Sequence, residues 1–129
     1  MENVATATGI EALEAARGFA RAIGESPQFR EYEQAEGSIK EDAEARTLLA
    51  EYQEAQKTLR MLQSWSGGNS QHGAQFRELE EKVFQHPKLR NYFDSQEKLV
   101  SLIQSLNRGL GEALGFDFAR LAKPAGGCC

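Results

Sequence analysis

The chain has 129 residues, a formal net charge of −4 and 40% hydrophobic residues. This length suits one domain that buries roughly two-thirds of its unfolded surface. The hydrophobic content supplies a core, which argues against wholesale disorder. Acids and bases alternate without a run of four bases, which gives no support to direct nucleic-acid binding. The longest apolar run, Leu48–Ala50, is too short to cross a membrane, and the first residues lack a secretory signal pattern. We therefore expect a cytoplasmic protein without a membrane partner.

The first predicted helix begins at Thr8, because Thr8 and Glu11 have the spacing of a capping box. It ends at Gly24. One face of this helix is apolar and carries Ile10, Leu13, Ala16, Ala20 and Ile23. We expect residues 1–7 to form a flexible tail, residues 8–115 a folded core, and residues from about 122 to 129 a second flexible tail of one domain.

The second predicted helix begins with Ser26 as its cap and Pro27 at its first position. Asp42 opens the third helix, in which apolar residues recur at steps of four and three: Leu48, Tyr52, Ala55, Leu59 and Leu62. This spacing is typical of a coiled-coil seam. The seam either packs inside the chain against the helix that begins at Pro87 or mediates dimerisation. A glycine-rich turn at Ser64–Ser70 follows.

A fourth helix is predicted at 71–85, before His86 and Pro87 interrupt the helical pattern. A long helix then runs from Pro87 to Gly115, and the apolar residues after it are expected to dock back onto it. The sequence therefore predicts an all-α fold, an up-down bundle of about five helices with two long antiparallel helices.

A weak internal repeat relates two of these helices. The segments Ser26–Tyr32 and His86–Tyr92 each contain a cap, a proline, an apolar residue, an arginine and a tyrosine in the same order. The cap and proline start a helix, and the apolar residue and tyrosine face the core. Only Arg30 and Arg90 have no role in this scheme, so they are candidates for partner contacts or for links between the two units.

The pattern resembles the YlbF/YmcA family of small helical bacterial proteins over roughly residues 10–113. The residues that carry the resemblance are Ala20, Ile23, Glu25, Ser26, Pro27, Phe29, Tyr32, Ala35, Asp42, Glu44, Leu48, Tyr52, Leu79, Glu80, His86, Pro87, Tyr92 and Leu99. The resemblance implies a non-enzymatic cytoplasmic regulator. Members of the family in Bacillus act with a partner, YaaT, in competence, sporulation and biofilm formation. They are also linked to RNase Y and messenger RNA maturation, and to iron–sulfur clusters held through cysteines.

Cys128 and Cys129 are the only cysteines. Either they give two thiolates to a metal or iron–sulfur cluster shared with a partner, or they form a solvated tail. Two thiolates are half of what a cluster generally takes, so a cluster is expected only in a complex. Trp65, beside Gly67 and Gly68, is either a partner anchor or folds back over its helix.

No catalytic constellation is evident. His72 is placed in the glycine-rich turn and His86 at a helix cap, and neither has a metal ligand at a typical spacing. Serine, threonine and lysine lack a base at a motif spacing. We predict an adaptor that forms a homo-oligomer, a hetero-complex with family members and a YaaT-like protein, or both; the alternative is a redox subunit that uses Cys128 and Cys129.

Overall fold

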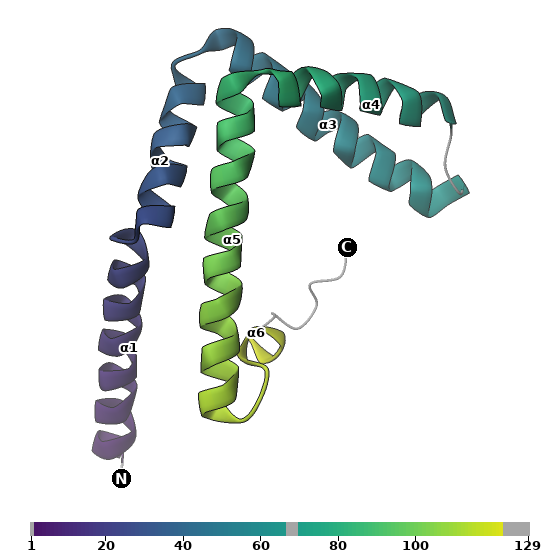
Figure 1. Ribbon diagram of the computed structural model, residues 1–129. Coiled ribbons are helices and arrows are strands. Elements are labelled where there is room, and N and C mark those ends of the chain that lie inside the picture. The colour runs from purple at the N-terminus through teal and green to yellow at the C-terminus, as the bar shows by residue number, and fades with distance from the viewer. Residues whose placement is uncertain (1, 67–69, 123–129) are drawn as a thin grey trace.

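The computed structural model describes residues 2–66 and 70–122, and the regular structure in these ranges is entirely helical (Figure 1). Its helices are α1 (Glu2–Gly24), α2 (Pro27–Lys40), α3 (Ala43–Ser66), α4 (Ser70–Gln85), α5 (Pro87–Leu114) and α6 (Phe118–Leu121). The all-α prediction is confirmed. None of the described helices is both long enough and apolar enough to span a bilayer.

The helices form two arms that meet at one corner (Figure 1). In the first arm α1 and α2 follow one another, and α5 runs antiparallel to α2. In the second arm α3 and α4 form a hairpin that leaves the corner to one side. The main packing partners are α2 with α5 and α3 with α4.

The core lies at the corner where these four helices meet. Its buried side chains are Ile39 from α2, Ala45 from α3, Val83 from α4 and Leu89 from α5. Half-buried residues surround this cluster, among them Leu48, Leu49, Tyr52, Tyr92 and Phe93. One small cluster therefore joins both arms, and each arm extends away from it.

Local chemistry explains where several helices begin and end. The Ser26 hydroxyl accepts a hydrogen bond from the Phe29 N–H at 3.2 Å, and Pro27 occupies the first position of α2. Gly115 ends α5 in the left-handed conformation, with φ at 79°, which only glycine adopts without strain. These boundaries confirm the predictions made from the sequence.

Three local predictions are wrong. α1 begins at Glu2, so Thr8 lies inside the helix and does not mark its start; residues 2–7 contain no glycine or proline that would interrupt it. His86 occupies the cap position of α5, but its side chain makes no capping hydrogen bond. His72 lies in α4 rather than in a turn.

The seam on α3 does not lie along α5. α3 packs along α4, where Tyr52 stacks on Phe76 with ring centroids 5.4 Å apart, and it meets α5 mainly at the corner. The heptad spacing identified the apolar face of α3, but spacing within one helix does not show which other helix covers that face. The helix that covers it is α4, which follows α3 in the chain. The seam therefore packs inside the chain, as one of the two alternatives predicted, but it packs on α4 and not on the helix that begins at Pro87.

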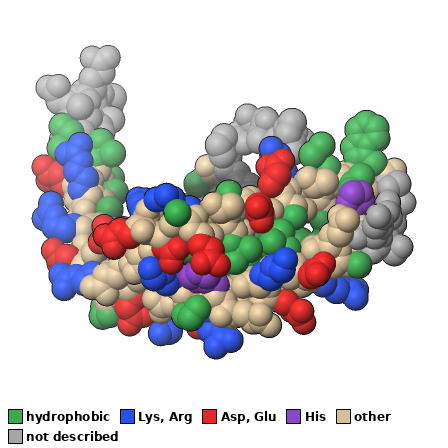
Figure 2. Space-filling model, turned by 90° about the horizontal axis from the view of Figure 1, so that it is seen from above, with side chains coloured by type: hydrophobic (Ala, Val, Ile, Leu, Met, Phe, Trp, Pro, Cys, Tyr) green, Lys and Arg blue, Asp and Glu red, His purple; other side chains and the backbone are tan. Residues whose placement is uncertain are grey.

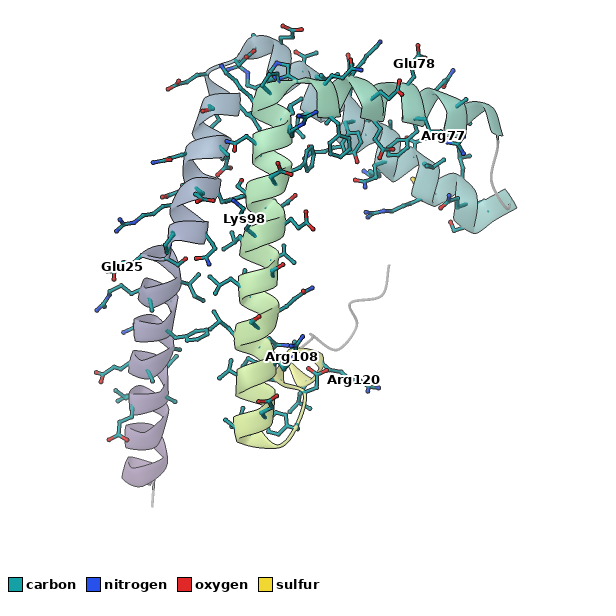
Figure 3. The ribbon with its side chains drawn as sticks, viewed as in Figure 1. Glu25, Arg77, Glu78, Lys98, Arg108 and Arg120 are labelled. Carbon is teal, nitrogen blue, oxygen red and sulfur yellow. The ribbon has the colours of Figure 1, made fainter. Side chains whose placement is uncertain are left out.

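The internal repeat forms the contact between α2 and α5. Because the two helices are antiparallel, the equivalent tyrosines meet: the rings of Tyr32 and Tyr92 lie 5.5 Å apart and their hydroxyl oxygens 3.3 Å apart. Lys98 on α5 reaches toward α2 (Figure 3), where its Nζ lies 3.4 Å from an Oε atom of Glu31. The repeated segments thus hold the first arm together.

We expect the Tyr92 phenol to make stability depend on alkaline pH. Burial, followed by the hydrogen bond with Tyr32, raises the pKa of Tyr92 to about 12 from the ordinary value of 10.0. The neutral phenol is therefore favoured in the folded state. Its contribution is complete below pH 10 and is lost as the pH rises from about 10 to 12.

The free energy of unfolding of the wild type should accordingly fall more steeply than that of Tyr92→Phe over this pH window. Urea unfolding followed by circular dichroism at pH 8, 10 and 11 measures the difference between the two proteins. A difference that does not change with pH would contradict this assignment.

Candidate interaction surfaces

Exposed apolar side chains gather away from the core. Nine of the twelve large apolar residues that are exposed in the described chain lie on α1, the distal half of α5, and the segment of α6. They are Ile10, Leu13, Phe19, Val100, Ile103, Leu114, Phe116, Phe118 and Leu121. Exposed apolar residues that gather in this way mark interaction sites in soluble proteins. We call these nine residues the distal apolar surface.

The distal apolar surface spans elements that do not pack closely on one another. α1 makes close backbone contact only with α2 among the described helices, whereas α6 packs on the end of α5. Figure 2 shows α1 standing clear of the rest of the molecule. The sequence signalled the apolar face of α1, but periodicity does not reveal whether such a face is covered.

A second exposed apolar site lies at the end of the α3–α4 hairpin. Trp65 is 87% exposed on the last turn of α3, and Met61, one turn earlier on the same side, is 57% exposed. Trp65 therefore does not fold back over its helix. Its proposed role as a partner anchor stays a prediction.

The two arginines of the repeat have different environments. The Arg90 Nε donates a hydrogen bond to the Phe84 carbonyl at 3.1 Å, so Arg90 ties α5 to the end of α4 rather than to the other repeat unit. Arg30 is exposed and forms no side-chain hydrogen bond or ion pair with the residues described. Arg30 remains available to a partner, and Arg90 is a link within the fold.

Cys128 and Cys129 lie outside the described residues. The remainder of the chain contains no cysteine. A single chain therefore does not fit the four-thiolate ligand set of an iron–sulfur cluster.

One cluster of potential metal ligands was missed by sequence reasoning. Asp42 and Glu44 at the start of α3 lie beside His86 at the start of α5, and one ligand atom from each falls within 4.8 Å of the others. His86 was interpreted as a cap, and the two acidic residues are more than forty positions away from it. Only the fold brings them together.

The surroundings of this cluster favour a clasp between helices over a metal site. The Asp42 Oδ1 accepts a hydrogen bond from the Ala45 N–H at 3.1 Å, and its Oδ2 lies 3.2 Å from Lys88 Nζ and 3.9 Å from His86 Nε2. A metal at Nε2 would place the imidazole proton on Nδ1. That atom is buried and has no hydrogen-bond partner among the described residues, so the second shell that a metal-bound histidine needs is missing.

The electrostatics of the clasp agree with this interpretation. The hydrogen bond from the Ala45 backbone, followed by that from Lys88, lowers the pKa of Asp42 below its ordinary value of 3.8. The carboxylate thus caps α3 and holds the lysine of α5 at once. Its role is to join the starts of two helices at the corner.

An all-helical, two-armed fold whose exposed apolar residues lie on helix faces is typical of proteins that work by binding other proteins. The family described as control of competence regulator ComK, YlbF/YmcA, matches residues 12–115 of this chain. The chain belongs to the YlbF/YmcA family, which confirms the resemblance seen in the sequence.

A solved structure supports the fold. The chain is similar to one in the X-ray crystal structure of Bacillus subtilis RicA in complex with RicF, with a TM-score of 0.65 and 16% sequence identity. The similarity covers 82% of this chain and 95% of that one. No curated protein is a significant match to the sequence.

We expect substitutions of Asp42 to separate its two roles. Asp42→Ala removes both the cap and the ion pair, whereas Asp42→Asn keeps a capping oxygen and loses only the charge. At pH 7 Asp42→Ala should therefore be the less stable of the two in urea unfolding. Because the pKa of Asp42 is lowered, the contribution of the charge is present above about pH 3.8 and is lost as the pH falls below it.

The difference in the free energy of unfolding between the wild type and Asp42→Asn should thus become smaller as the pH falls from 5 to 3. Equal stability of the alanine and asparagine variants at pH 7 would show that Asp42 does not cap α3.

Proposed function

We propose that this protein is a non-enzymatic cytoplasmic adaptor that regulates by holding other proteins together. The observation that carries the proposal is the distal apolar surface, whose nine large side chains stay between 39% and 74% exposed in the described chain. Membership of a family named for control of a competence regulator supports a regulatory output.

The partners that we propose come from the family. A chain in the crystal structure of RicA in complex with RicF is similar in fold to this chain. By analogy, we propose that this chain binds a second YlbF/YmcA-family protein, further copies of itself, or both. We further propose a YaaT-like protein as a component of the complex, and RNase Y-dependent messenger RNA maturation as the process it regulates.

The two exposed sites suit different contacts. The distal apolar surface is broad and lies on helices, as in the interfaces of stable complexes. Trp65 is an exposed tryptophan on the last turn of α3, and tryptophan is enriched among the residues that dominate binding energy in protein interfaces. Two sites at opposite parts of the chain allow it to bridge two proteins.

The alternative proposal is a redox subunit that uses Cys128 and Cys129. Two adjacent thiolates make up half of a cluster's ligand set, so a cluster here needs ligands from another chain. If this alternative holds, the complex purified without oxygen should contain iron, and Cys128→Ser combined with Cys129→Ser should remove it. Equal iron content in both preparations would eliminate the alternative and leave the adaptor proposal intact.

The adaptor proposal is tested by co-expression with the YlbF/YmcA-family and YaaT-like proteins of the same genome. We expect these proteins to co-purify with the tagged chain in a fixed ratio. Trp65→Ala should weaken the complex by at least tenfold, because a buried aromatic anchor contributes about 2 kcal/mol or more. Binding is measured by titration calorimetry with purified components.

Gln63→Ala is the matched control, since Gln63 is exposed on the same turn but points away from Trp65. It should bind as the wild type does. Failure of every candidate partner to bind would overturn the adaptor proposal. Normal binding by Trp65→Ala would remove only the assignment of Trp65 as an anchor.

A further inference from the structure

The hairpin of α3 and α4 extends beyond the corner as an arm of two helices. In the described chain, α2 and α5 contact the hairpin at its corner end, and the rest of the arm has no further helix along it (Figure 1). Two packed helices leave a groove on each side of their line of contact, and a third helix in such a groove buries the apolar side chains at its floor. The sides of the hairpin are therefore places where another helix can pack.

One side of the hairpin is hollowed along much of its length. A hollow of about 690 Å³ lies at the corner end, and a second hollow of about 410 Å³ lies further along the arm. Glu51 lines both hollows, so they form one continuous groove, which we call the hairpin groove. From Glu44 to Thr58 the groove follows α3 for about 21 Å, or about four helical turns. Half-buried apolar side chains form its floor: Leu48, Ala55, Leu59, Phe76 and Leu79.

The α3 side of the hairpin groove is acidic. Glu44, Glu51 and Glu54 line it and are exposed. Lys82 of α4 is the only lysine or arginine among the described residues that line the groove. Neither Lys82 nor any of the three glutamates takes part in an ion pair within the described residues. The excess of unpaired carboxylates gives the groove a negative potential, which attracts a cationic partner.

The acidic side of the groove continues along α3 to the exposed tryptophan. Residues that follow one another at steps of four and three stay on one side of a helix. Six residues of α3 have this spacing: Thr47, Glu51, Glu54, Thr58, Met61 and Trp65. The row is acidic nearer the corner and apolar at the end of the hairpin, where Met61 and Trp65 are both exposed. The two ends of the row therefore suit different side chains of a partner.

We propose that the hairpin groove binds an amphipathic helix of a partner protein. This inference rests on the proposed function, because it names the site and the chemistry of one of the adaptor's contacts. Basic side chains in one half of the bound helix face Glu51 and Glu54, and large apolar side chains in the other half cover Met61 and Trp65. The apolar row of the bound helix packs on the floor of the groove. Burial of the floor supplies affinity, and the change from acidic to apolar along α3 selects the direction of the helix.

The groove favours a helix over other classes of ligand. An extended peptide needs the edge of a sheet for its backbone hydrogen bonds, and the described chain contains only helices. A nucleic acid would bring its phosphates against Glu51 and Glu54, and like charges repel. A helix makes its own backbone hydrogen bonds and presents its apolar side chains in one row, as a straight groove between two helices requires.

The test uses synthetic helical peptides and the full-length protein. Three peptides of about 18 residues share one apolar row at helical spacing and differ only in one half, where the flanking positions are lysine, glutamine or glutamate. Trp65 is the only tryptophan of the chain, so its fluorescence reports burial at the end of the groove. We expect the lysine peptide to shift the Trp65 emission to shorter wavelength. It should bind about tenfold or more tightly than the glutamate peptide.

Charge reversal within the groove should reverse this preference. Glu51→Lys with Glu54→Lys should bind the glutamate peptide about tenfold or more tightly than the lysine peptide. Glu78→Lys with Glu81→Lys is the matched control, because it makes the same change in charge at the same spacing on α4 but outside the groove. Figure 3 shows Glu78 pointing away from α3. The control should keep the preference of the wild type for the lysine peptide.

All four substituted positions are exposed, so the variants should keep the fold, and circular dichroism should show equal helix content. The inference is overturned if no peptide shifts the Trp65 emission. It is also overturned if the groove variant keeps the preference for the lysine peptide, or if the control loses that preference to the same extent.

The adaptor proposal is decided separately, by co-purification with the candidate partner proteins. If these proteins co-purify but no peptide binds, the adaptor proposal stands and the hairpin groove is not a helix-binding site. If no candidate partner binds but the peptides discriminate as expected, the groove inference stands and the adaptor proposal is contradicted.

Discussion

The structure depends on the close packing of α2, α3, α4 and α5 around one small corner. The buried apolar side chains there come one from each helix: Ile39, Ala45, Val83 and Leu89. A helix exposes its apolar face to water unless another element covers it, so the part of a helix that extends beyond this corner needs a second helix packed on it. α4 packs along α3, and α2 packs on the half of α5 that is nearer the corner. α1 and the far half of α5 extend beyond the reach of the corner.

Polar contacts align the elements that the corner brings together. The tyrosine pair sets how α2 and α5 meet, and its hydroxyl contact at 3.3 Å satisfies two half-buried phenols at once. The Asp42 clasp does the same for the starts of α3 and α5. Such contacts contribute modest net free energy, but leaving their groups buried and unpaired would be costly. These contacts therefore determine how the helices are aligned, and they add little to the free energy of unfolding.

Local chemistry made much of this fold predictable from the sequence. Ser26 with Pro27 and Gly115 mark helix ends through interactions within a few residues, and these predictions are confirmed. What depends on distant residues could not be predicted. A heptad row states that α3 has an apolar face but not that α4 covers it, and the cluster around His86 joins positions far apart in sequence. The exposure of Trp65 was likewise undecidable, because both alternatives fit the same spacing.

The division between covered and uncovered faces connects the fold to its role. Ordering a residue costs about 1 kcal/mol or more of backbone entropy, and an isolated helix is marginal in water, so a long helix gains stability from a neighbour that covers its apolar face. α1 spans 23 residues, yet Ile10 and Leu13 on its apolar face stay 52% and 58% exposed. Burial of these side chains by another protein would supply attraction, and the exposed charges of both signs on the same helix would favour one orientation of that protein. Attraction and a preferred orientation are the two requirements of a specific contact.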